Sequence, residues 1–222
     1  MRGGLYAVCA LWLCVGNALS APLPEFSAPQ QARLVRHYGD QAALRYDAWR
    51  RLMTELAGQP VSQQLDKINV FFNQFRFDDD QRLWGENNHW ATPMEFIGLG
   101  AGDCEDFALA KFLSLQALGV DGDQLRLVYV KALQLDQFHM VLAYYPSAGS
   151  VPLVLDNLDG QIRPANERQD LAPIYSFNGK RLWLSGPRGG QVFHNQPALD
   201  NWGRFNRRRY QGEMRRPPGL KE

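Results

Sequence analysis

Residues 107–118 constrain the fold more than any other part of the chain. They are apolar with three exceptions: Lys111, Ser114 and Gln116. A helix that is apolar around most of its circumference must be covered by other elements on nearly every side. Gly119 supplies a helix stop directly after the segment. We therefore expect a buried helix at the centre of the fold.

Two further helical segments come earlier in the chain. In residues 30–56, and again in residues 61–77, apolar side chains recur at steps of three and four, which is the helical period. The first segment is interrupted near Gly39 and ends before Gly58. Both are expected to be amphipathic helices that face the core.

A polar loop, residues 78–91, separates these helices from the central one. It begins with three aspartates: Asp78, Asp79 and Asp80. They lack the alternating ligand spacing of an EF-hand loop, so we interpret them as a solvated turn, with a cation site as the alternative. The next residues predict a helix start, with Thr92 as N-cap, Pro93 at the first helical position and Glu95 as the capping-box partner.

Extended segments follow the central helix. They read "LRLVYVKA" from Leu125, "FHMVLAYY" from Phe138 and "PLVLDNL" from Pro152, with weaker candidates at "IYSF" and "RLWL". Helices followed by consecutive strands are typical of α+β proteins. The sequence therefore predicts an α+β fold in which N-terminal helices and the buried helix pack on an antiparallel sheet.

The N-terminal residues 1–20 have the pattern of a secretory signal peptide. Arg2 is followed by an uncharged, mostly apolar run that ends at Leu19, and Ser20 and Ala21 are small residues suited to cleavage. A membrane anchor is the alternative, but an apolar run of about 15 residues is shorter than the roughly 20 that a span needs. We expect export and cleavage after Ser20.

The remaining chain suits one globular domain, residues 21–186, followed by a tail, residues 187–222. A hydrophobic content of 45% and a formal net charge of +1 fit a protein with a core, and argue against a disordered or nucleic-acid-coating chain. The tail is rich in Gly, Pro, Asn and Arg, with an excess of basic residues from Arg204 onward. We interpret it as a solvated flexible tail, with an anion or membrane contact as the alternative.

One thiol remains after the expected cleavage, because Cys9 and Cys14 leave with the signal peptide. Cys104 stands in the block "GAGDCEDFALAKF", at the expected first turn of the central helix. A solitary thiol in an exported protein suggests a reactive group, since the compartment is oxidising. The helix N-terminus favours a thiolate and offers N–H groups to an oxyanion. A buried, inert cysteine is the alternative.

A cysteine nucleophile needs a base within hydrogen-bond reach, and the histidines are the candidates. His37 lies in an upstream helix, His89 in the polar loop and His194 in the tail. His139 lies inside a strand, on the same face as Val141. On this pattern alone a core histidine fits at least as well as a catalytic one.

The expected hairpin between the second and third strands brings a carboxylate to His139. If Ala148 is the centre of the turn "PSAGS", the numbers of opposed residues sum to about 296, and 139 + 156 = 295. Opposed side chains in an antiparallel pair have Cβ atoms about 4.5 to 5.5 Å apart, close enough for Asp156 to hold the imidazole. Cys104, His139 and Asp156 are therefore the expected triad, with Asn157 as the fallback orienting residue.

The ordered motifs together resemble a known family. The blocks "WATPMEF", "GAGDCEDFALAKF", "LRLVYVKA", "HMVLAYY", "PLVLDNL" and "IYSFNG" resemble those of the LapG-type periplasmic proteases, the bacterial transglutaminase-like cysteine proteinases. The resemblance implies a papain-like or transglutaminase-like fold and a triad at Cys104, His139 and Asp156. It further implies calcium dependence and cleavage of a large repeat adhesin near its N-terminus, which releases biofilm cells. An inner-membrane cyclic di-GMP receptor that sequesters the protease is the implied partner.

The resemblance places calcium ligands in the acidic residues around the cysteine, here Asp103, Glu105 and Asp106. Carboxylates are hard oxygen ligands. Helix capping is the alternative for Asp103 and Asp106, although three carboxylates exceed what capping needs. A carboxylate about 7 Å from the sulfur, at an effective dielectric near 20, would disfavour the thiolate by on the order of 2 kcal/mol, and a bound cation would reverse this effect.

The combined expectation is a calcium-dependent periplasmic cysteine endopeptidase that works through a thioester. An acyl transferase or amidase would form the same thioester and differ only in the acceptor, so the sequence leaves these activities open. A catalytically inactive calcium-binding partner module is a further alternative, against which the intact triad argues. Trp90 is a candidate substrate-channel residue, with core packing as its alternative.

Overall fold

The computed structural model describes residues 27–185 and 197–218. The expected signal peptide and residues 187–196 of the expected tail lie outside the described residues. The helices are α1 (Ala28–Tyr38), α2 (Asp40–Leu56), α3 (Val61–Phe72), α4 (Asp80–Trp84), α5 (Pro93–Leu99), α6 (Cys104–Ala117) and α7 (Pro197–Tyr210). The strands are β1 (Arg76–Phe77), β2 (Ala101–Gly102), β3 (Leu125–Ala132), β4 (Gln137–Tyr144), β5 (Leu153–Leu155), β6 (Arg163–Pro164), β7 (Leu171–Phe177) and β8 (Leu182–Leu184). Within the described ranges, no helix combines the length and the apolar character that crossing a membrane requires.

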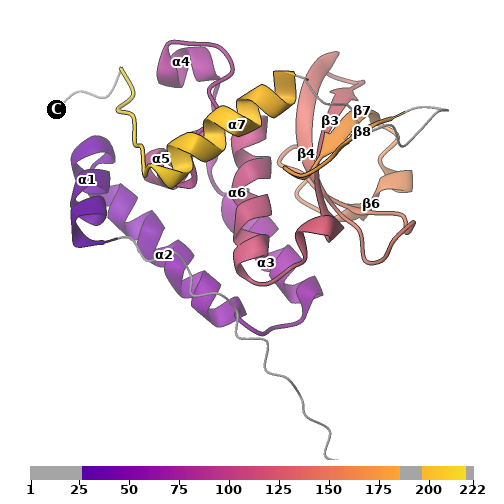
Figure 1. The fold of residues 1–222 in the computed structure, drawn as a ribbon, viewed down its shortest axis with the longest axis horizontal. Helices are drawn as coiled ribbons and strands as arrows, with labels where there is room; N and C mark the ends of the chain where they lie inside the picture. The colour runs from indigo at the N-terminus through magenta and orange to yellow at the C-terminus, as the bar shows by residue number, and fades with distance from the viewer. Residues whose placement is uncertain (1–26, 186–196, 219–222) are drawn as a thin grey trace, which may run out of the picture.

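An antiparallel sheet forms one side of the molecule (Figure 1). Its strands lie in the order β6-β5-β4-β3-β7-β8, and β1 and β2 form a separate short parallel pair. The central strands β3 and β4 pair along their whole length, from Leu125 opposite Tyr144 to Ala132 opposite Gln137. Helices on one side and this sheet on the other confirm the predicted α+β fold.

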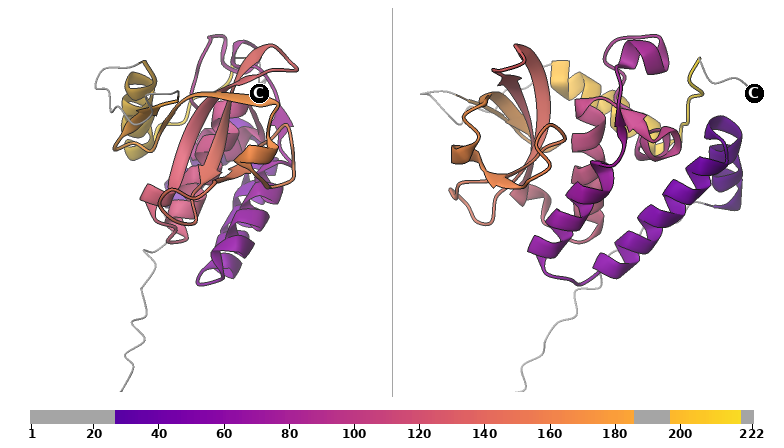
Figure 2. Two further views of the ribbon diagram at one scale, coloured as in Figure 1. Left: turned by 90° about the vertical axis from the view of Figure 1, so that its right-hand side faces the viewer. Right: turned by 180° about the vertical axis from the view of Figure 1, so that it is seen from behind.

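Helix α6 is enclosed, as its apolar sequence predicts. It packs on β3 and β4, and α3 packs against it from behind in the view of Figure 1 (Figures 1 and 2). Ser114 on α6 accepts a hydrogen bond from the indole of Trp49, at 3.1 Å. Lys111 is buried, and burial lowers the pKa of its amino group to about 7, with the charge of Asp156 opposing the shift. Two of the three polar exceptions, Lys111 and Ser114, are thus accommodated inside the fold, whereas Gln116 is exposed.

The helix boundaries follow local backbone demands. Gly39 has a φ of +79°, a left-handed conformation that suits glycine, and it separates α1 from α2. The helix predicted for residues 61–77 ends earlier, at Phe72, because residues 76–77 form a strand that pairs with β2. Helix α5 begins as predicted, with the hydroxyl of Thr92 accepting from the backbone of Glu95.

The polar loop contains helix α4, which the sequence analysis did not predict. The interpretation of its aspartates as a solvated turn is wrong for two of them, since Asp78 and Asp80 are 7% and 4% exposed. Asp78 forms ion pairs with Arg76 and Arg82. Asp79 is exposed and pairs with Arg82. Asp80 points into the protein because it shares a helix face with the buried Leu83 and Trp84.

The C-terminal residues pack on the domain instead of forming a solvated tail. Helix α7 crosses over α6 (Figure 1), and its Phe205 is 1% exposed. Trp202 makes edge-on contacts with Phe112 of α6 and Phe177 of β7, with ring centroids 5.8 and 5.9 Å apart. Met214, beyond the helix, is also buried. The expectation of a solvated tail is wrong for this described part, because its arginines flank an apolar face that the fold covers.

Candidate active site

Cys104 is the first residue of α6, and only Asp103 separates it from β2. Asp103 is the N-cap of the helix, in a capping box with Asp106, so the predicted helix start is confirmed. A Cβ on Gly102 would lie 2.4 Å from Oδ2 of Asp106, so the turn into the helix requires glycine at this position. The half-buried sulfur therefore lies at the positive end of the helix dipole.

Strand β4 brings His139 to this end of α6. The residue after it, Met140, donates a backbone hydrogen bond to the sulfur of Cys104. His139 is 4% exposed, and its Nε2 lies 2.7 Å from Oδ1 of Asp156. An imidazole that donates from Nε2 keeps the lone pair of Nδ1 for proton exchange. The structure thus brings the three predicted triad residues to one place.

The route by which Asp156 reaches His139 differs from the predicted register. In the ladder between β4 and β5, Leu142 lies opposite Leu155, so opposed numbers sum to 142 + 155 = 297, and His139 would face position 158. Asp156 leaves the ladder after β5, and its Oδ1 accepts the backbone N–H of Leu158 at 3.0 Å. This Asx-type turn carries the carboxylate to the imidazole.

Arg168 holds the second oxygen of Asp156, and the sequence analysis did not single it out. Its Nη2 lies 2.7 Å from Oδ2 of Asp156, and its Nε and Nη2 also pair with Asp170. Burial raises the pKa of Asp156, but hydrogen bonds and charge from His139, Leu158 and Arg168 outweigh it and lower that pKa to about 2. The carboxylate is therefore ionised and oriented. The isolated arginine in a polar segment carries no sequence signal that points to Asp156.

Negative charge surrounds the thiol. The sulfur of Cys104 donates to Oε2 of Glu105 at 3.0 Å. Burial raises the pKa of the thiol well above its usual value, the charges of Glu105 and Asp103 raise it further, and the hydrogen bond from Met140 opposes them. In this arrangement the thiol is held protonated.

An acidic cluster lies next to the start of α6. Asp80, Asp103 and Asp106 each offer a carboxylate oxygen, and these oxygens lie within 4.8 Å of one another. Asp103 and Asp106 belong to the predicted calcium set. The carboxylate of Glu105 lies outside this group, against the thiol and Asp103. Asp80 lies in the loop that the sequence analysis interpreted as solvated. Its position three residues before Leu83, on an apolar helix face, is the sequence signal that could have identified it as buried.

The cluster has oxygen donors that the described protein does not satisfy. Oδ1 of Asp80 and Oδ1 of Asp103 are buried and have no hydrogen-bond partner among the described residues. Burial and the neighbouring carboxylates raise the pKa of Asp80 to about 6 and that of Asp103 to about 12, and they raise the pKa of Asp106 as well. Buried, mutually repelling hard oxygens without partners fit a calcium ion.

Trp90 packs in the core. It is 6% exposed and stacks on Phe177, with ring centroids 5.9 Å apart and an interplanar angle of 15°. Its indole N–H donates to Asn88 at 3.0 Å. These contacts fit the core alternative for this residue.

Comparison with known proteins shows which family this chain resembles. The model of the bacterial transglutaminase-like cysteine proteinases (BTLCP) matches residues 45–171. A structure of LapG from Legionella pneumophila is 41% identical, covers 84% of this chain and 99% of its own, and superposes with a TM-score of 0.70. No match was found among curated proteins.

Two further structures of the Legionella pneumophila protein differ in treatment. The EGTA-treated form is 40% identical, covers 84% of this chain and 100% of its own, and has a TM-score of 0.72. The calcium-bound form is 40% identical, covers 82% and 99%, and has a TM-score of 0.69. A similar chain has therefore been seen with calcium.

Proposed function

Because the chain belongs to the bacterial transglutaminase-like cysteine proteinases, we propose that it is a calcium-dependent endopeptidase with Cys104, His139 and Asp156 as its catalytic triad. The observation that carries the triad is the 2.7 Å hydrogen bond between Nε2 of His139 and Oδ1 of Asp156. It lies beside the helix end that presents Cys104, whose sulfur is contacted by the residue after His139. This is the arrangement of nucleophile, base and orienting group that thiol proteases use.

Each residue has a distinct role in the proposed reaction. The sulfur of Cys104 attacks the carbonyl carbon of the scissile peptide, and the thiol proton passes to Nδ1 of His139. Asp156 stabilises the imidazolium through Nε2 and remains ionised. His139 then gives the proton to the leaving amine, which departs and leaves a thioester on Cys104. Water, deprotonated by His139, hydrolyses this thioester and restores the thiol.

We assign to the oxyanion of each tetrahedral intermediate the backbone N–H groups at the start of α6, apart from that of Asp106, which donates to the side chain of Asp103. The same turn carries Asp103 and Asp106 of the acidic cluster, so the oxyanion donors and these two carboxylates share one short segment of backbone. A change in charge at either carboxylate therefore changes the electrostatic potential at the sulfur of Cys104.

We propose that Asp80, Asp103 and Asp106 hold the calcium ion, with Glu105 next to the site. The support is the pair of buried carboxylate oxygens that have no partner among the described residues, and the calcium-bound form of the Legionella protein. A bound calcium ion supplies positive charge that offsets the carboxylates near the sulfur. In the absence of that charge, the thiol of Cys104 is held protonated by its hydrogen bond to Glu105.

We propose a periplasmic location and an adhesin substrate for this protease. The support for export is the signal-peptide pattern of residues 1–20. Family resemblance supports the remainder: a large repeat adhesin cut near its N-terminus, release of biofilm cells, and sequestration of the protease by an inner-membrane cyclic di-GMP receptor.

A gel assay tests the proposed function. The purified protein is mixed with the N-terminal region of a large repeat adhesin in calcium or in chelator, beside the Cys104→Ala variant. Two discrete fragments are expected only with calcium and intact Cys104. An uncut adhesin in every lane would contradict the substrate, and cleavage in chelator would contradict the role of calcium.

A labelled primary amine added to the same reaction separates hydrolysis from acyl transfer. Hydrolysis leaves both fragments unlabelled, because water resolves the thioester. Stable incorporation of the amine into the acyl fragment would instead establish a transferase.

A further inference from the structure

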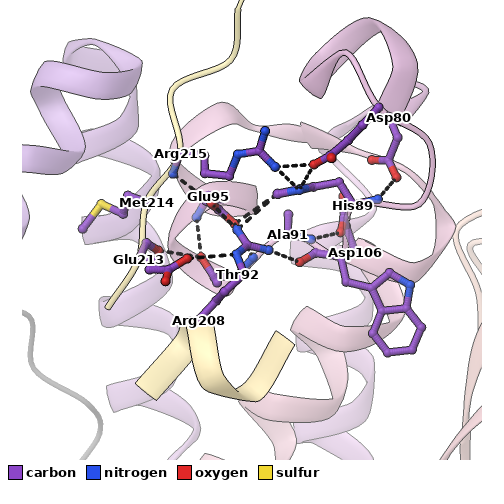
Figure 3. A network of polar contacts seen from close by, with 12 residues as sticks. Asp80, His89, Ala91, Thr92, Glu95, Asp106, Arg208, Glu213, Met214 and Arg215 are labelled. Atoms are coloured by element: carbon purple, nitrogen blue, oxygen red, sulfur yellow. Dashed lines mark hydrogen bonds and ion pairs between the residues drawn. The ribbon is translucent and has the colours of Figure 1, made fainter. Parts of the chain in front are cut away.

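Three consecutive residues, 89–91, connect two members of the acidic cluster, and we refer to them as the 89–91 bracket. The backbone N–H of His89 donates to Oδ2 of Asp80. The backbone N–H of Ala91 donates to Oδ1 of Asp106 at 2.7 Å. Asp80 comes from α4 and Asp106 from α6, so the bracket links carboxylates from two separate helices (Figure 3).

The middle residue of the bracket is held by the C-terminal helix. The carbonyl of Trp90 accepts from Nη1 of Arg208 at 3.0 Å, across 118 positions of sequence. The same guanidinium lies 3.2 Å from Nε2 of His89 through its Nη2. Arg208 therefore contacts two of the three residues of the bracket, from the side of α7.

Arg208 is itself fixed by a buried carboxylate. Glu95 on α5 is 0% exposed, and its two oxygens lie 2.5 and 2.6 Å from Nη2 of Arg208. Glu95 also accepts the backbone N–H groups of Thr92 and Arg215, at 2.7 and 2.8 Å (Figure 3). A guanidinium anchored this way has little freedom, since a planar fork with several bonds is geometrically specific.

We propose that Arg208 is a positioning residue for the calcium site, which it serves by holding the 89–91 bracket and, through it, Asp80 and Asp106. The inference rests on the proposed calcium site. Carboxylates that repel one another separate unless their partners hold them, and a looser site must be drawn together on binding. Outer partners of metal ligands commonly affect metal affinity by about 10- to 100-fold.

The sign of the effect separates positioning from simple electrostatics. Removing a positive charge near a cation site favours cation binding. If charge alone mattered, Arg208→Met would bind calcium more tightly. If Arg208 positions the bracket, the variant binds more weakly. Arg207→Met is the matched control, because Arg207 is the exposed neighbour on the same helix.

The test is a calorimetric calcium titration of the purified full chain, carried out on the wild type, Arg208→Met, Arg208→Lys and Arg207→Met. Because Arg208 acts through the direct partners of the ligands, we expect Kd to rise roughly tenfold in Arg208→Met, the lower end of that range, and by less in Arg208→Lys, which keeps the charge beside Glu95. Kd should be unchanged or slightly lower in Arg207→Met. Amide hydrogen exchange in chelator supplies a readout that does not involve calcium: peptides that cover the bracket should exchange faster in Arg208→Met only.

The outcomes distinguish this inference from the proposed function. A wild type that binds no calcium overturns the proposed metal site and the inference together. A wild type that binds calcium, with Arg208→Met equal to or tighter than Arg207→Met, overturns only the inference. Weaker binding without faster exchange in the bracket also overturns the positioning role. If Arg208→Met does not fold, the double variant Glu95→Gln, Arg208→Met takes its place, because it removes both charges of the buried pair. Its calcium Kd and its exchange in the bracket are then compared with those of Arg207→Met.

Discussion

Asp156 holds His139 from outside the strand ladder: its Oδ1 lies 2.7 Å from Nε2 of the imidazole, although the pairing of β4 with β5 stops at Leu155. The same oxygen accepts the N–H of Leu158, and the second oxygen pairs with Arg168. Both oxygens of this buried carboxylate are engaged, so it has little freedom to rotate. The orientation of the proposed base is therefore set by a turn and an arginine beyond the sheet.

The stability of the protein should depend on pH through Asp156. Its folded pKa of about 2 lies below the unfolded value near 3.9, so its contribution is present above about pH 4 and lost as pH falls through about 2. Asp156→Asn should be less stable than wild type at pH 6, and the gap should close by about 2 kcal/mol towards pH 2. Denaturant unfolding of both proteins across this pH range measures the difference in their free energies of unfolding. A stability difference that does not change with pH would falsify the lowered pKa of Asp156.

Arg168 should matter more for stability than a surface arginine of the same region. Arg168→Met leaves Asp156 buried without its ion pair and should cost about 3 kcal/mol or more of unfolding free energy. Arg163→Met is the matched control: it breaks a half-exposed pair with Asp159 and should cost less than about 1 kcal/mol. Urea unfolding at neutral pH compares the two variants. Equal losses would show that Arg168 is not a specific support of Asp156.

Asp80 should contribute to calcium binding although it lies far from Cys104 in sequence. Asp80→Asn should raise the calcium Kd by at least roughly tenfold, because it removes a charged ligand. In chelator the same variant should unfold at a higher temperature than wild type, since it relieves repulsion among three carboxylates within 4.8 Å. Asp79→Asn, the exposed neighbour, should change neither quantity. A loss of stability in chelator would argue against repulsion in the cluster.

Calcium should increase the reactivity of Cys104. The thiol pKa is raised by burial and by the charges of Glu105 and Asp103, so a cation at the cluster should lower it. The rate of iodoacetamide alkylation at pH 7 should be roughly tenfold or more higher in calcium than in chelator. Glu105→Gln should narrow the difference by raising the rate in chelator. Identical rates in calcium and chelator would rule out the electrostatic role of the metal.

Periodic and local patterns in the sequence were enough to predict several elements of the fold. The apolar circumference of residues 107–118 predicted an enclosed helix, and α6 is enclosed by helices and the sheet. The capping residues Thr92 and Glu95 predicted the start of α5, and the strand at residues 125–132 has the predicted bounds. These features follow from the sequence because each depends on neighbours within a few positions of the chain.

The same local reasoning failed where a contact joins distant segments. Residues 197–210 carry many arginines and were interpreted as a solvated tail, yet Trp202 packs this helix on α6 and β7, and Phe205 is buried. The hairpin register was predicted from the turn centre alone. The observed ladder sums to 297 instead of about 296, and Asp156 reaches His139 through an Asx-type turn after β5.

The sequence by itself determined the α+β class, the position of Cys104 at a helix start, and which histidine and carboxylate to consider. Only the tertiary structure decided which further residues surround them: Arg168 on Asp156, Asp80 beside Asp103, and Arg208 behind the 89–91 bracket. The physical reason is that periodicity and capping record interactions along one element. A buried ion pair or a cluster of ligands depends instead on how separate elements pack, and no spacing in the chain encodes that distance.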